Sequence, residues 1–67
     1  MNIEFEQFVQ LIGGPKAAYE YLEYSEAMIY KIRHGKRAIN PVKAKMITDR
    51  FPQLSFSRLL LPDNQAA

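Results

Sequence analysis

Side chains that can recognise another molecule concentrate between Ser25 and Arg37. Ser25 suits a helix N-cap, Glu26 suits the first turn, and Gly35 can take the left-handed conformation that ends a helix. The stretch therefore predicts a helix over residues 25–34. At helical spacing the apolar residues Met28, Ile29 and Ile32 share one side, and Glu26, Ala27, Tyr30, Lys31 and His34 lie around the rest. We expect the first side to enter a core and the second to contact a partner.

The positive charge of the chain is confined to its middle third. Residues 30 to 50 hold seven lysines and arginines against one acid, a charge of +6, while residues 1 to 29 sum to −4 and residues 51 to 67 to zero, which together give the net +2. A concentrated basic surface is the electrostatic footprint of a phosphate-binding protein. The alternative is an ordinary solvated charged face.

Length and composition narrow the class of protein. Sixty-seven residues make a single domain, 1–67, of a size at which one hydrophobic core gives only about 3 to 5 kcal/mol. The chain has no cysteine, which excludes a small disulfide-built scaffold. Neither a signal peptide nor an apolar run of about 20 residues is present, so we expect a soluble cytoplasmic protein that does not enter membranes. The tail 63–67 has little to bury and is expected to fray.

An enzyme is not expected. The chain has no cysteine, a single histidine and no glycine-rich phosphate loop, and it is too short to build a lined substrate pocket. His34 lacks a second histidine or a cysteine with which to share a metal, so we interpret it as a cation or phosphate donor at a helix end. We therefore predict no catalytic residue, metal, cofactor or small-molecule substrate.

Apolar spacing and capping residues predict an all-α fold of four to five short helices. We expect helices over 2–12, 15–22, 25–34 and 41–51 and a last short turn over 56–60. The residues expected to be buried are Phe5, Phe8, Val9, Ile12, Ala18, Tyr19, Leu22, Val42, Ala44 or the stem of Lys45, Met46, Ile47 and Phe51. The second and third helices are joined by about three residues, the pattern of a helix-turn-helix.

The chain resembles the small Cro-type repressors of bacteriophages, most closely the YdaS-like group. The residues that carry this resemblance are Gly13, Gly14, Ala17, Ala18, Leu22, Tyr24, Ser25, Ile29, Lys31, Gly35, Arg37 and Leu61-Pro62-Asp63. It implies a lambda-repressor-like DNA-binding domain that binds operator DNA as a dimer or as pairs of monomers that assemble on a palindrome. It also implies a location in the cytoplasm of a bacterial host, on its nucleoid. It places base-contacting positions on Glu26, Ala27 and Lys31.

Three residues depart from the family pattern. Tyr19 stands where a small residue is usual, Glu23 where the turn usually has glycine, and Glu26 where a neutral polar residue is common. Because a side chain at Glu23 would not readily take a positive φ, we expect some difference in the turn.

A helix in the DNA major groove reads bases with its N-terminal half. By that geometry the base-reading candidates are Ser25, Glu26, Ala27, Tyr30 and Lys31. Lys31 could donate to guanine, Glu26 could accept from cytosine N4, and Ala27 could pack on a thymine methyl. Glu26 has the alternative role of a first-turn charge, and Tyr30 that of a lid over the core. The phosphate-binding candidates are Lys16, Ala17, Arg33, His34, Lys36, Arg37, Lys43 and Lys45.

The apolar run near the C-terminus predicts a subunit contact. Phe56, Leu59, Leu60 and Leu61 exceed what one short helix is expected to bury, so a homodimer contact is placed there.

Two other functions compete with DNA binding. The four tyrosines would suit a protein-interaction module without sequence-specific DNA binding if Tyr21 and Tyr24 were exposed. A basic amphipathic membrane-surface helix fits less well, because the basic residues lie on several segments.

Overall fold

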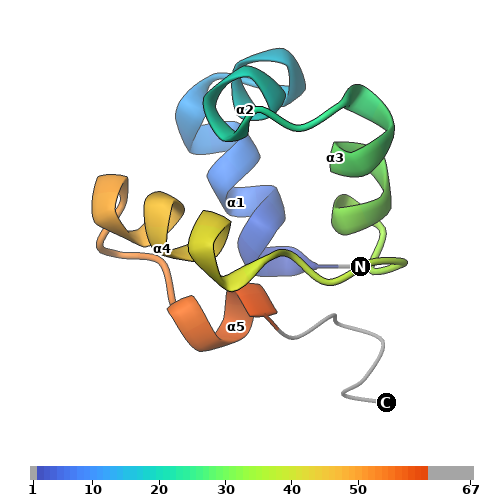
Figure 1. Cartoon of the computed structure of the whole chain (residues 1–67). Coiled ribbons are helices and arrows are strands. Elements are labelled where there is room, and N and C mark those ends of the chain that lie inside the picture. The colour runs from blue at the N-terminus through green and yellow to red at the C-terminus, as the bar shows by residue number, and fades with distance from the viewer. Residues whose placement is uncertain (1, 61–67) are drawn as a thin grey trace.

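Five helices form the fold in the computed structural model, which describes residues 2–60 (Figure 1). They are α1 (Ile3–Ile12), α2 (Pro15–Leu22), α3 (Glu26–Arg33), α4 (Pro41–Arg50) and α5 (Phe56–Leu60). Residues 2–60 contain no strand. The all-α prediction is confirmed, and each predicted helix matches an observed one to within a residue or two at its ends.

The helix starts follow from side-chain caps. The side chains of Asn2, Ser25 and Asn40 accept hydrogen bonds from the backbone N–H groups at the starts of α1, α3 and α4, respectively. Each of these bonds satisfies an N–H that has no partner inside its own helix. Pro15 and Pro41 occupy first helical positions, where a missing N–H costs nothing. The sequence therefore defines these starts locally.

The core forms around α1, which packs against α2, α3 and α5. The buried apolar side chains of this core are Phe5, Phe8, Val9, Ala18, Leu22, Ile29, Ile32, Ile39, Ala44, Ile47, Leu54 and Leu59. Figure 1 shows α1 in the middle of the molecule, with α2 and α3 meeting at one end and α4 and α5 at the other. Ile39 and Leu54 lie between helices, so helical spacing gives no sign of their burial.

One predicted core residue is wrong. Val42 is 69% exposed, whereas Ala44 and Ile47 of the same helix are fully buried. Positions two apart on a helix differ by about 200° around its axis, so a helix that buries Ala44 turns Val42 to solvent. Lys45 is also exposed, so Ala44, not the Lys45 stem, is the buried member of that pair.

Asn2 connects three helices. Its backbone N–H donates to the carbonyl of Arg33 at the end of α3 (3.0 Å), and its side-chain Nδ2 donates to the carbonyl of Leu59 in α5 (2.9 Å). Asn2 is only 1% exposed, so these bonds are made away from water. They fix the C-terminal end of α3 to the rest of the bundle.

Candidate nucleic-acid interface

Residues 23–25 join α2 to α3, and Glu23 has a left-handed backbone with φ 59° and ψ 38°. It is the one non-glycine residue with positive φ in residues 2–60. Two hydrogen bonds accompany this conformation, from the Glu23 N–H to the Glu20 carbonyl and from the Tyr24 N–H to the Tyr19 carbonyl. They form a Schellman helix ending, the motif that usually has glycine at this place. The turn thus has the glycine-type geometry despite Glu23, which corrects the expectation that a side chain would alter it.

The two sides of α3 divide as expected. Ile29 and Ile32 are buried and Met28 is half-buried. On the other side, the five candidate base-reading residues, Ser25, Glu26, Ala27, Tyr30 and Lys31, are all exposed. A helix with one exposed polar side and one anchored apolar side can be inserted into a groove without losing its contacts to the bundle.

Cationic and aromatic side chains gather at the C-terminal end of α3. The rings of Tyr30 and His34 lie 4.2 Å apart, and the Lys36 Nζ lies 5.6 Å from the Tyr30 ring centroid. Tyr30 is 53% exposed, so it is not a lid over the core. His34, Lys36 and Arg37 are exposed and remain candidates for phosphate contact.

Arg33 is engaged within the chain. Its Nε and Nη2 donate to the two carboxylate oxygens of Glu6, at 2.9 and 2.6 Å. These hydrogen bonds lower the pKa of Glu6 and raise the pKa of Arg33. This two-pronged pair ties α3 to α1 and uses two of the five N–H donors of Arg33, whose contact with a phosphate stays a prediction. Helical spacing gave no sign of this pair, since its partners are 27 residues apart.

The remaining phosphate candidates lie on α2 and α4. Lys16 is exposed and Ala17 half-buried in the first turn of α2. The Lys43 Nζ lies 5.5 Å from the ring centroid of Tyr24, which brings the start of α4 to the turn before α3. Lys45 is exposed and pairs loosely with Asp49 at 3.5 Å, one turn further along α4. Lys43 is thus beside the α2–α3 connection.

The tyrosines of α2 and of the turn serve the fold. Tyr19, Tyr21 and Tyr24 are partly buried against the core. The Tyr21 hydroxyl donates to the carbonyl of Met46 at 3.1 Å, which joins α2 to α4. The condition on which a tyrosine-based protein-binding patch depended, exposure of Tyr21 and Tyr24, is therefore not met.

The predicted subunit contact is corrected at Leu59. Leu59 is fully buried in the chain's own core, because α5 packs against α1. Leu60 is half-buried, Phe56 is 42% exposed, and Leu61 lies outside the described residues. Phe56 is therefore more exposed than Leu59 and Leu60.

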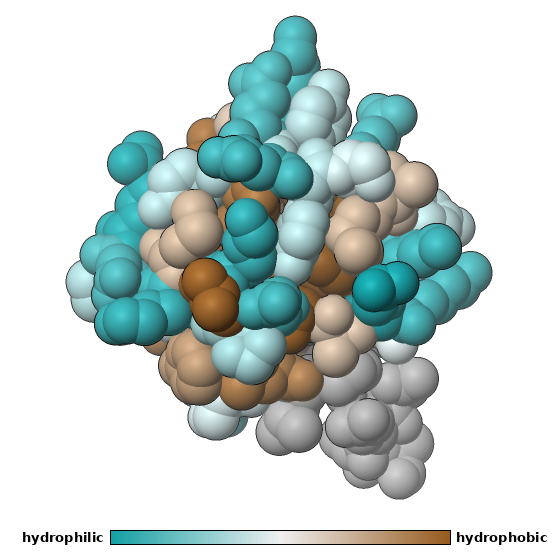
Figure 2. Space-filling view, viewed as in Figure 1, coloured by the Kyte–Doolittle hydropathy of each residue, from teal (hydrophilic) through white to brown (hydrophobic). Residues whose placement is uncertain are grey.

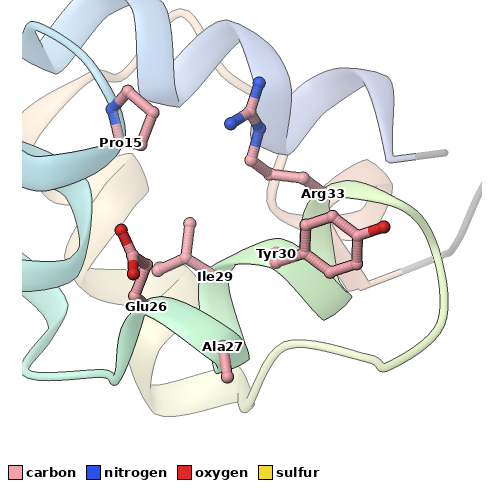
Figure 3. Close-up of a pocket in the computed structure, with 6 residues that line it drawn as sticks. All are labelled: Pro15, Glu26, Ala27, Ile29, Tyr30 and Arg33. Atoms are coloured by element: carbon pink, nitrogen blue, oxygen red, sulfur yellow. The ribbon is translucent and has the colours of Figure 1, made fainter.

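An open hollow of about 440 Å³ lies beside α3. It is lined by Pro15 at the start of α2 and by Glu26, Ala27, Ile29, Tyr30 and Arg33 of α3. Figure 3 shows Pro15 across from Glu26 and Ile29, with Arg33 and Tyr30 further along the helix. No local pattern marks Pro15 as a residue that faces α3, because that position depends on how the two helices pack. Figure 2 shows hydrophilic residues around most of the margin of the molecule in this view, with a few apolar residues between them.

Comparisons with known proteins identify no relative of this chain. No protein-family model matches the chain, and no match was found among curated proteins or solved structures. None of the helices in the described part of the chain has the length and apolar character needed to cross a bilayer. Functional inference therefore depends on the residues and their arrangement.

Proposed function

We propose that this chain is a sequence-specific double-stranded DNA-binding protein in which α2 and α3 form a helix-turn-helix and α3 enters the major groove. The observation that carries the proposal is the exposed side of α3. It combines a hydroxyl, a carboxylate, a methyl group, a phenol and an amine, a mixture that suits the varied donors and acceptors of base edges.

Charge around α3 supports the same function. Lys36, Arg37 and His34 follow the helix, Lys16 lies at the start of α2, and Lys43 lies beside the turn. We expect about four of these side chains to contact phosphates in each subunit. The slope of log K against log salt should then be about −3 to −4 per subunit.

The biological setting is proposed from the resemblance to Cro-type phage repressors. We propose a transcriptional repressor encoded by a phage or prophage that acts on the nucleoid in the bacterial cytoplasm. Two copies on a palindrome would read half-sites about 34 Å apart. Among the residues predicted to form the subunit contact, Phe56 supports such an interface best, because its side chain is exposed.

Two substitutions separate base reading from phosphate binding. Lys31→Ala should weaken binding to the selected site by about 1 to 3 kcal/mol and relax the preference at one base pair. Arg37→Ala should weaken binding to all duplexes about equally. Arg58→Ala removes an exposed cation of α5 and serves as the matched control. Fluorescence anisotropy with specific and random duplexes measures all three. If Lys31→Ala and Arg37→Ala bound both duplexes as the parent does, the proposal would be refuted.

A further inference from the structure

The hollow beside α3 has an unusual combination of walls. Pro15, Ala27, Ile29 and Tyr30 supply aliphatic and aromatic surface. Two charged residues line it, Glu26 and Arg33, and the Arg33 guanidinium already donates to both carboxylate oxygens of Glu6. Glu26 is exposed, and no described residue forms a hydrogen bond or ion pair with its carboxylate. The hollow therefore offers a hydrogen-bond acceptor with negative charge next to apolar surface.

The charge of these walls disfavours a DNA phosphate as the group that enters the hollow. A phosphate beside the Glu26 carboxylate would be repelled, and the Arg33 guanidinium already donates two of its five N–H groups to Glu6. A base edge with a donor next to an apolar position fits instead. In the major groove cytosine presents its N4 amino group as donor, with C5 beside it. Thymine presents the O4 acceptor, guanine presents two acceptors, and the adenine N6 donor is adjacent to the N7 acceptor.

We infer that Glu26 and the hollow beside it recognise a cytosine and bind 5-methylcytosine more tightly than cytosine. This inference rests on the proposed DNA-binding function. The Glu26 carboxylate accepts from the cytosine N4 amino group, and the 5-methyl group lies against Ile29 and Tyr30, which follow Glu26 by three and four residues on the same side of α3 (Figure 3). The hollow has ample room for a methyl group at about 440 Å³. Removing one methyl group from water corresponds to an affinity gain of about fourfold. Thymine at the same position keeps the methyl group but turns O4 toward the carboxylate, and should bind about 5- to 150-fold more weakly.

The test uses the full chain and the duplex that it selects from a random pool. At each position of that duplex, cytosine is replaced in turn by 5-methylcytosine and by thymine, and dissociation constants are measured by anisotropy. At one position of each half-site we expect 5-methylcytosine to bind about fourfold tighter than cytosine, and thymine to bind more weakly than both. Glu26→Gln has nearly the same shape, but its amide can also donate to thymine O4, so the cytosine-to-thymine ratio should fall toward one. Tyr30→Ala should reduce the gain from the methyl group, and Arg58→Ala should leave both ratios unchanged.

The outcomes separate this inference from the proposed function. A selected site at which methylation of every cytosine is neutral or harmful would overturn the inference while DNA binding stands. The same holds for a site with no cytosine, or for ratios that Glu26→Gln leaves unchanged although its thermal unfolding matches that of the parent. If no duplex is enriched, the inference and the proposed function are both refuted.

Discussion

Replacing Glu23 by glycine should stabilise the protein. Glu23 holds φ at 59° in the turn between α2 and α3, and its exposed carboxylate has no partner among the described residues. A left-handed conformation costs an L-residue about 1 to 2 kcal/mol, a penalty that glycine does not have. Glycine also raises the conformational entropy of the unfolded chain, which lowers the stability of the folded state by about 0.4 to 1 kcal/mol. With the middle of each range, the net expectation for Glu23→Gly is a gain of about 0.5 to 1 kcal/mol.

Chemical and thermal unfolding followed by circular dichroism measures this gain. In a domain of this size it corresponds to a rise of about 2 to 8 °C in Tm. Glu23→Ala removes the same carboxylate but keeps the Cβ, so it should give little or none of the gain. Glu20→Gly places glycine at an exposed position within α2 and should instead cost about 1 kcal/mol. Equal stabilities for Glu23→Gly and Glu23→Ala would refute the assignment of strain to this backbone.

The remaining predictions concern the contacts that hold α3. Glu6→Gln should cost about 0.5 to 1 kcal/mol near pH 7, because the partly exposed pair with Arg33 is screened by solvent. Since that pair lowers the pKa of Glu6 from its ordinary 4.5, the unfolded chain takes up the proton first as the pH falls. The advantage of the parent over Glu6→Gln in urea unfolding should therefore shrink below about pH 5 and vanish once the pH is below the folded pKa; a pH-independent difference would contradict this. Asn2→Ala should cost about 2 to 4 kcal/mol by removing a cap and leaving the buried Leu59 carbonyl without its donor. Asn2→Ser keeps a capping oxygen and should cost less, so equal losses would argue against the cap. Ile32→Ala should cost about 2 to 5 kcal/mol in the same assay, and a loss below 1 kcal/mol would mean that α3 is not anchored there.

The local parts of the fold could be predicted from the sequence. Three helix starts can be predicted from their capping residues, Asn2, Ser25 and Asn40. Each side chain accepts a hydrogen bond from a backbone N–H only two or three residues away. The buried side of α3 follows from its apolar spacing, since a helix turns such residues to one face. The exposed positions of the candidate base readers follow from the same spacing.

Long-range pairings could not be predicted in this way. The Arg33 bond to Glu6 and the Asn2 bond to Leu59 join residues 27 and 57 positions apart, and no local pattern marks either partner. Local spacing therefore shows neither that Arg33 bonds to α1 nor that Leu59 is buried in the core and not in a subunit contact. Glu23 shows the opposite case, in which packing of α2 and α3 overrides the preference of a single residue for negative φ.

Selection of bound duplexes from a random pool tests the central claim most directly. If α3 reads base edges, repeated rounds of binding and amplification should enrich one palindromic sequence with half-sites about one helical turn apart. Lys31→Ala should then lose preference at one position of each half-site, while Arg37→Ala should enrich the same sequence with lower affinity. A pool that remains random after many rounds at low salt would contradict the claim that this protein is a sequence-specific DNA-binding protein.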